Sequence, residues 1–208
     1  LLRPDFREIY TGCKRMGLML SINSNATLID EKMVDFLAAD PPSRVNITLY
    51  GASGETYGAL CGDPAAYERA VRAILALQSA GVLVKLNCSV TPYNRQDAEK
   101  IYAFAHEHRL PVQAASYMFP PVRACEHGCS APDRLPAAQA AAEKIRYDKS
   151  RFTPEELRER WNALLKGESV ADPDDECQEL PTERIRCRAG SSTFWVTWDR
   201  QLRPCGMM

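Results

Sequence analysis

Four strand-like segments alternate with helix-like segments over the first 118 residues, and this alternation constrains the fold more than any other feature of the sequence. The strands are spaced roughly 30 residues apart, the length of one strand, one helix and two loops. They start near Leu18, Val45, Val82 and Val112. Because this alternation is typical of βα units, we predict an α/β fold, a partial parallel (β/α) barrel followed by helices and a C-terminal β-hairpin.

Helical periodicity fills the intervals between these strands. Apolar residues recur at spacings of three and four before Gly17, and Asp30 is placed to cap the second helix. One helix is predicted between Gly51 and Gly81, and another over residues 96–108. A parallel sheet needs cover on both faces or closure into a barrel, which four strands entered through a helix do not achieve. We therefore expect at least one further strand upstream, in a protein that is truncated here at both ends.

The character of the sequence changes after Met118. An alternating aromatic and β-branched run over residues 193–198, a short turn and residues 202–205 together predict the hairpin. Helices are predicted near residues 137–148 and 153–166. We therefore expect three parts: a partial barrel over residues 1–122, a connecting loop, helices and linker over 123–176, and a cysteine-rich unit over 177–208.

Charge and composition disfavour several partners. The chain has 26 basic and 27 acidic residues and a net charge of −1, so it offers no field to attract a nucleic acid or an anionic membrane. Its apolar runs fall far short of the ~20 residues that cross a bilayer. Eight cysteines among 208 residues are too few for a small disulfide scaffold, which favours a reducing compartment and a cytoplasmic location.

Polar residues cluster where each predicted strand meets its loop. In a parallel α/β barrel this edge carries the reactive groups. Amide and hydroxyl side chains there can bind a small ligand with hydroxyl, amino and carboxylate groups, although composition alone favours turn capping as the role of any one of them. No paired carboxylates, activated serine or phosphate loop accompany them, so no catalytic residue is predicted. The cluster comprises Asn23, Ser24, Asn25, Thr48, Tyr50, Asn87, Ser89, Thr91, Asn94, Ser116 and Tyr117.

Two cysteines flank the predicted hairpin. The two ends of a hairpin lie close together, so Cys187 and Cys205 can direct two thiolates at one metal cluster. A disulfide fits the same spacing, but a reducing compartment weakens that alternative. Cys177 supplies a third sulfur ten residues earlier.

The other cysteines divide into two groups. Cys125, His127 and Cys129 lie within five residues, which suits either part of a zinc site or an ordinary loop. The remaining three lie in predicted helix, loop and strand segments, where a free cysteine behaves as a small hydrophobic residue. These are Cys13, Cys61 and Cys88.

Together these residues make the chain similar to radical S-adenosylmethionine (radical SAM) enzymes that carry a SPASM-type auxiliary iron–sulfur domain. Residues 1–6 resemble the residues directly after the Gly-Gly-Glu-Pro motif of that family. Residues 24–28 (SNATL) are similar to its Thr-Asn-Gly-Thr-Leu motif, and residues 47–51 (ITLYG) are similar to its Ile-Ser-Leu-Asp-Gly motif. Cys187 and Cys205 match the late cysteine signature, with Arg200 at its glycine position. The defining C-x3-C-x2-C triplet occurs nowhere in the chain, so we expect it to lie upstream.

The resemblance implies one-electron chemistry supplied by cofactors. In this family a [4Fe–4S] cluster, whose ligands are absent from this chain, passes an electron from an external donor to S-adenosylmethionine (AdoMet). The resulting 5′-deoxyadenosyl radical abstracts hydrogen from a substrate, in relatives often a peptide or protein. The resemblance thus implies an oxidoreductase, although the 208 residues by themselves are expected to be inactive.

The same resemblance implies roles for individual residues. Thr48 would contact the ribose of AdoMet, and Ser24 and Asn25 the neighbouring wall. Adenine or substrate would be contacted by Asn87, Ser89 and Asn94. An auxiliary [4Fe–4S] cluster would be bound by Cys187 and Cys205. Two alternatives stay open: a non-catalytic metal-binding or interaction fragment, and an unrelated (β/α) barrel enzyme.

Overall fold

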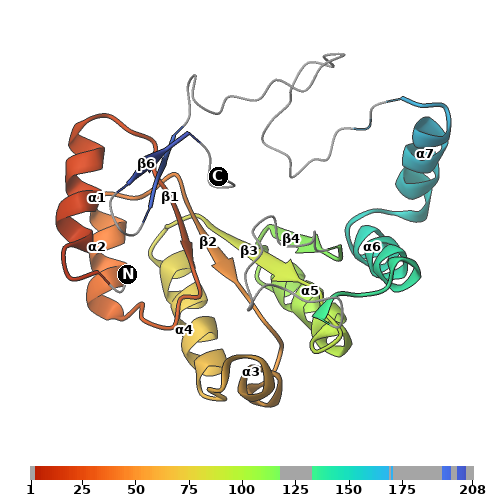
Figure 1. The fold of residues 1–208 in the computed structure, drawn as a ribbon, viewed down its shortest axis with the longest axis horizontal. Coiled ribbons are helices and arrows are strands. Elements are labelled where there is room, and N and C mark those ends of the chain that lie inside the picture. Colours follow the sequence, from red (N-terminus) through yellow and green to blue (C-terminus); the bar gives the residue numbers. More distant parts are fainter. Residues whose placement is uncertain (1–2, 118–132, 169, 171–193, 198–200, 205–208) are drawn as a thin grey trace. The chain divides into compact units, whose positions relative to one another are not determined.

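A computed structural model describes residues 3–117, 133–168, 170, 194–197 and 201–204 (Figure 1). The chain forms two compact units. Residues 1–118 and 132–157 make up the first, and residues 119–131 and 158–208 the second.

The first unit is built on a four-stranded parallel sheet. Its strands follow one another in chain order, each hydrogen-bonded to the next. This order and direction confirm the predicted α/β fold with parallel βα units. The strands are β1 (Ser21–Ser24), β2 (Arg44–Thr48), β3 (Val84–Ser89) and β4 (Val112–Ala115).

Helices connect the strands, and α4 and α5 pack against β3 (Figure 1). Asp30 caps α2, its side chain accepting a hydrogen bond from the Met33 amide at 2.9 Å, as predicted. Gly17 and Gly81 adopt left-handed φ angles of 76° and 78° just after α1 and α4, which confirms their role as stop signals. The helices are α1 (Phe6–Arg15), α2 (Glu31–Ala39), α3 (Gly54–Cys61), α4 (Ala66–Ser79), the 3₁₀ turn η1 (Arg95–Asp97), α5 (Ala98–Glu107) and α6 (Ala137–Arg151).

Two details of the predicted helices and strands are wrong. The first strand begins at Ser21 instead of Leu18, because Leu18 and Met19 lie in the loop after α1 with 50% and 91% of their surfaces exposed. The short helix α3 was not predicted, because glycines bound it and it buries only Thr56 and Tyr57. Its polar and apolar residues therefore show little helical periodicity.

The second unit contains most of α7 (Pro154–Leu165) and a two-stranded antiparallel ribbon. The ribbon pairs β5 (Trp195–Val196) with β6 (Leu202–Arg203) and confirms the predicted hairpin. The cysteines predicted to flank it, Cys187 and Cys205, lie outside the described residues, as do Cys125, Cys129 and Cys177.

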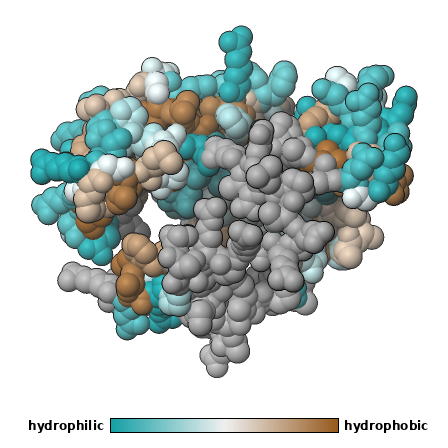
Figure 2. All heavy atoms as spheres, turned by 90° about the horizontal axis from the view of Figure 1, so that it is seen from above, coloured by the Kyte–Doolittle hydropathy of each residue, from teal (hydrophilic) through white to brown (hydrophobic). Residues whose placement is uncertain are grey.

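Hydrophilic residues cover much of the described surface in the view of Figure 2, interrupted by smaller hydrophobic patches. None of the described helices has the length and apolar character needed to cross a bilayer.

Candidate functional site

The sheet of the first unit has two chemically different faces. Val45 and Ile47 of β2 are in register with Val84 and Leu86 of β3, and all four are buried in the core with helix side chains. We call this side the helix-covered face. Because side chains alternate along a strand, the residues between them point the other way. This polar face carries Asn23, Arg44, Asn46, Thr48, Lys85, Asn87 and Gln113.

Hydrogen bonds link the strands on the polar face. The Asn46 amide nitrogen donates to Asn23 Oδ1 at 2.8 Å, across the β1–β2 pair. The Arg44 Nε donates to Asn46 Oδ1 at 2.7 Å. The amides are thereby fixed in place, so the face presents an ordered polar surface.

Thr48 and Asn87 lie side by side on this face, as register partners near the carboxyl ends of β2 and β3. Gln113 of β4 is the register partner of Asn87 on its other side. Thr48 and Asn87 are partly accessible. A hydroxyl and two amides in a row offer both donors and acceptors to a ligand. The structure thus brings together two of the predicted site residues.

Ser24 and Asn25 have local roles in the turn after β1. Ser24 is in register with Ile47 and so belongs to the helix-covered face, and its Oγ accepts a hydrogen bond from the Ala26 amide at 3.0 Å. Asn25 Oδ1 accepts from the Thr27 amide at 3.3 Å and the Thr27 hydroxyl at 3.0 Å. These bonds support Ala26, whose φ of 61° is unusual for a residue with a side chain. Capping, the alternative that the sequence left open, accounts for both contacts.

Asn94 is buried and fully hydrogen-bonded. Its Nδ2 donates to the backbone oxygens of Tyr50 at 2.8 Å and Ser89 at 3.0 Å. Its Oδ1 accepts from the Thr91 amide at 2.7 Å and hydroxyl at 3.1 Å. Two donors and two acceptors are the full capacity of an amide side chain. Asn94 therefore ties the loops after β2 and β3 together, whereas the Ser89 side chain is exposed.

Asp97 holds the loop after β2 from the same side. Its buried Oδ2 accepts from the Ala52 amide at 2.9 Å and from the Thr56 hydroxyl at 2.5 Å. A Cβ atom at Gly51 would lie 2.5 Å from Thr56 Cγ2 and 3.1 Å from Asp97 Oδ2, so this position requires glycine. The loop that follows Thr48 is therefore tightly packed and held in one conformation.

Two buried titratable groups adjoin this region without taking part in the polar face. Burial raises the pKa of the Cys88 thiol to about 12. Cys88 lies on the helix-covered face, where it packs as a neutral core residue. Burial likewise raises the pKa of Tyr57 to about 12, and its hydroxyl accepts a hydrogen bond from the Tyr50 amide at 3.3 Å.

The sequence analysis considered only the residues at the ends of the strands, so it missed several residues of the polar face as site candidates. The signal was nevertheless present, because RVNIT (44–48) and KLNCS (85–89) alternate polar and apolar residues with period two. That period assigns every polar residue of a strand to one face. The missed residues are Arg44, Asn46, Lys85 and Gln113.

Grooves also occur away from the strand ends. One of about 530 Å³ is lined by residues of α5 and α6, including Tyr102, His106 and Arg146. Another of about 670 Å³ is lined by residues of α2, α4 and the loop before α2. Neither contains a residue of the polar face.

The described residues do not fit an iron–sulfur cluster. No group of three or more His, Cys, Asp or Glu side chains among them is placed to hold a metal ion. The sequence also has no C-x3-C-x2-C spacing. By contrast, the hydroxyl, amide and cationic groups of the polar face suit a ligand such as AdoMet, with its ribose, adenine and carboxylate.

Parallel strands in chain order, connected by helices and with one polar face, are the βα units of a partial (β/α) barrel. The family model of the radical SAM superfamily matches residues 1–105, half of the chain. The chain therefore belongs to the radical SAM superfamily, whose members use S-adenosylmethionine and a [4Fe–4S] cluster.

Two curated relatives are each named AdoMet-dependent heme synthase. The protein from Methanosarcina barkeri is 31% identical over 107 residues, which cover 51% of this chain and 31% of the relative. The protein from Nitratidesulfovibrio vulgaris is 24% identical over 220 residues, covering 100% of this chain and 58% of the relative. The chain thus spans less than two thirds of the length of either relative.

Solved structures share the fold. Native anSMEcpe with bound AdoMet and the Kp18Cys peptide has a TM-score of 0.54 and 17% identity, over 81% of this chain and 51% of that one. A domain of pyruvate-formate lyase-activating enzyme from Bacteroides vulgatus has a TM-score of 0.52 and 13% identity, over 67% of this chain and 81% of that one. At these identities the likeness shows the fold alone.

Proposed function

We propose that this chain forms the AdoMet-facing and substrate-facing wall of a radical SAM enzyme. The observation that carries the proposal is the polar face, whose Thr48 and Asn87 are register partners near the carboxyl edge of a radical SAM sheet. When bound, AdoMet and the reduced cluster supply the one-electron chemistry that removes a hydrogen atom from the substrate. The residues of this chain bind and orient the ligands.

Within this proposal, Thr48 hydrogen-bonds the ribose of AdoMet, and Asn87 binds adenine or substrate. Ser89 is exposed beyond Asn87 on the same strand and can extend that contact. Asn94 acts as a positioning residue, since its amide is fully used in holding the loops after β2 and β3. Ser24 and Asn25 form the adjoining wall through the turn that they cap.

We further propose a small-molecule substrate of the porphyrin type in place of the expected peptide or protein. The names of the two relatives, AdoMet-dependent heme synthase, support this class. The anSMEcpe structure with a bound peptide supports only the fold, because its sequence identity is 17%. Iron porphyrins are planar molecules with carboxylate side chains, which polar and cationic groups can recognise.

The cluster ligands are proposed to lie in sequence upstream of Leu1. The relatives are longer than this chain, and a C-x3-C-x2-C triplet one βα unit earlier would place them at the same edge of the sheet. An upstream reading frame without such a triplet contradicts the proposal.

We further propose that Cys187 and Cys205 bind an auxiliary iron–sulfur cluster, in a cysteine-rich unit over residues 177–208. After anaerobic reconstitution, the Cys187→Ala, Cys205→Ala double variant should bind less iron than the unchanged protein. An equal iron content removes these two residues as ligands.

The main experiment measures AdoMet cleavage by the full-length protein. With a reconstituted cluster, AdoMet and dithionite, we expect 5′-deoxyadenosine, detected by mass spectrometry. Thr48→Val should raise the dissociation constant for AdoMet about five- to tenfold, because one hydrogen bond of about 1 kcal/mol is lost. Thr48→Ser keeps the hydroxyl and should bind as the unchanged protein does. Absence of 5′-deoxyadenosine overturns the proposed function, and unchanged affinity in Thr48→Val removes Thr48 from the site.

A further inference from the structure

Lys85 lies on the polar face with its side-chain stem almost wholly buried. It lies on β3, which has a strand on each side, and only 6% of its surface is exposed. A buried charge is costly unless a group of opposite charge or a set of hydrogen bonds compensates it. Among the described residues, the buried side-chain atoms that lack a hydrogen-bond partner are Tyr102 OH and Arg134 Nε, and Lys85 Nζ is not one of them. The ammonium at the end of the buried Lys85 stem is therefore in contact with water.

Its neighbours on the sheet do not supply a group of opposite charge. The register partner Asn46 already uses its amide to bind Asn23 and Arg44. Strands β1 to β4 contain no Asp or Glu, so the charged residues of the polar face are Arg44 and Lys85, both cationic. Among the residues that the structure describes, the Lys85 ammonium has neither a hydrogen bond nor an ion pair.

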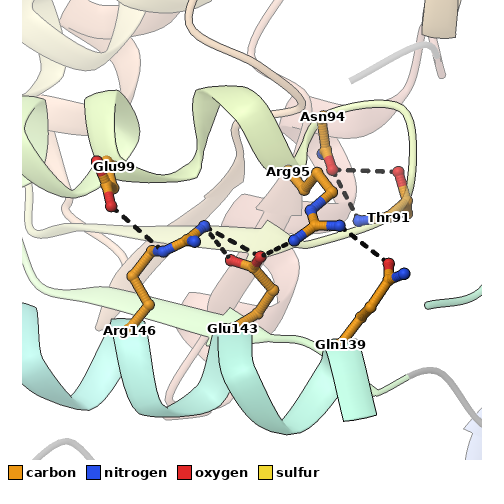
Figure 3. Close-up of polar contacts among 7 residues, drawn as sticks. All are labelled: Thr91, Asn94, Arg95, Glu99, Gln139, Glu143 and Arg146. Carbon is orange, nitrogen blue, oxygen red and sulfur yellow. Dashed lines mark hydrogen bonds and ion pairs between the residues drawn. The ribbon is translucent and has the colours of Figure 1, made fainter. Parts of the chain in front are cut away.

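Elsewhere the same unit compensates a buried charge completely. The side chain of Glu143 on α6 is 0% exposed, and its carboxylate receives hydrogen bonds from Arg95 and Arg146 (Figure 3). Those arginines are in turn held by Gln139 and Glu99. By contrast, the Lys85 ammonium has no protein partner among the described residues and is in contact with water, which an anionic ligand can replace.

We propose that Lys85 binds a carboxylate group of a ligand on the polar face. This inference rests on the proposed function and deepens it. Lys85 precedes Asn87 by two residues on β3, so its Cα lies about 6.6 Å from that of Asn87, on the same face. A ligand that contacts Thr48 and Asn87 can thus reach the ammonium with an extended acidic arm.

A carboxylate fits this position better than a phosphate. One ammonium flanked by neutral amides balances a single negative charge, whereas a phosphate carries nearly two. The backbone N–H groups of β3 are used in the sheet and form no anion-binding nest. Two carboxylates are available under the proposed function, that of the methionine part of AdoMet and those of a porphyrin substrate.

The test compares binding to full-length Lys85→Met and Lys85→Arg variants under anaerobic conditions. Met keeps the length of the apolar stem without the charge, and Arg keeps the charge. Lys32→Met, at an exposed position of α2, is the matched control. The probes are AdoMet, decarboxylated AdoMet and coproporphyrin III, which carries four carboxylates.

If Lys85 binds AdoMet, Lys85→Met should weaken AdoMet binding about tenfold or more and leave decarboxylated AdoMet unaffected. If it binds the substrate, Lys85→Met should weaken coproporphyrin III binding by a similar factor and leave AdoMet unaffected. In either case Lys85→Arg should retain most of the affinity, and Lys32→Met all of it.

Unchanged affinity of folded Lys85→Met for all three probes overturns the inference, even if the variant is less stable, because Lys85 then pairs with another part of the protein. AdoMet cleavage by the unchanged protein in that situation leaves the proposed function standing. Conversely, Lys85-dependent porphyrin binding without AdoMet cleavage overturns the proposed function and supports the inference. Binding of no probe by the unchanged protein overturns both.

Discussion

Two charged residues of the first unit that are largely buried, Glu143 and Lys85, differ in their partners. Glu143 is enclosed by two arginines, each of which has a further partner, so the network around it is closed (Figure 3). The Lys85 residue is 6% exposed, its ammonium is in contact with water, and it has no partner among the described residues. A closed network fixes one helix against another, whereas an open charge is available to a ligand.

The difference arises from the places of the two residues in the fold. Glu143 lies on α6, and its network reaches Arg95 of η1 and Glu99 of α5, so its ion pairs join separate elements. Lys85 lies on the polar face, where the neighbouring strands supply amides and a hydroxyl but no acid. The first region thus stabilises the fold, and the second is the one for which we propose ligand binding.

The largest effect should come from opening the closed network. The Arg95→Met, Arg146→Met double variant leaves the Glu143 carboxylate buried without a cation, which should lower the free energy of unfolding by about 3–5 kcal/mol. Urea unfolding followed by circular dichroism measures this. Lys149→Met, at an exposed position on the same helix, should change stability by less than about 0.5 kcal/mol. Equal stability of the two variants would mean that the network does not hold α6.

A smaller effect should come from crowding the loop next to the polar face. Gly51→Ala places a methyl group 2.5 Å from Thr56 Cγ2 and should cost about 1–3 kcal/mol and weaken AdoMet binding. Gly12→Ala is the control, since no atom lies within 4 Å of its Cβ position in α1. That control should be about 1 kcal/mol more stable than the unchanged protein. Thermal unfolding and AdoMet titration measure both quantities, and a stabilised Gly51→Ala would contradict the tight packing.

An effect that is absent at neutral pH and appears only above pH 9 concerns the helix-covered face, where Cys88 lies on the same strand as Lys85. Burial raises its pKa to about 12 in the folded state from a reference value of 9.0, so the unfolded chain loses this proton first as the pH rises. The contribution of the neutral thiol is thus complete below pH 9 and is lost between about pH 9 and 12, at no more than about 1.4 kcal/mol per pH unit.

Replacing this thiol should remove its share of the pH dependence. Cys88→Ala is expected to give a shallower decline of unfolding free energy above pH 9 than the unchanged protein, measured by urea unfolding at a series of pH values. Identical slopes would show that the thiol titrates alike in both states. Cys13→Ala, in α1, serves as the comparison.

The sequence allowed the order and direction of the parallel strands to be predicted, because period-two and helical patterns alternate clearly up to Met118. It also predicted the glycine stops and the cap at Asp30. The predicted start of the first strand was wrong, because the apolar Leu18 and Met19 have the sequence pattern of strand residues but lie in an exposed loop.

The candidate site was predictable in part. Thr48 and Asn87 were expected from their places at strand ends, and the register joins them. The sequence could not show that the hydrogen-bonding groups of Asn94 are all used, or that Asp97 lies close to Gly51. Both depend on contacts between residues about 40 positions apart along the chain, which no local pattern contains.

By itself the sequence determined the class of fold and the alternation of polar and apolar residues along β2 and β3, since both depend on short-range periodicity. Only the tertiary structure decided which polar groups are already satisfied and which are left open. That distinction requires knowing which side chains meet after the strands pair and the helices pack. Glu143 and Lys85 differ for this reason alone, as each is simply a charged residue in the sequence.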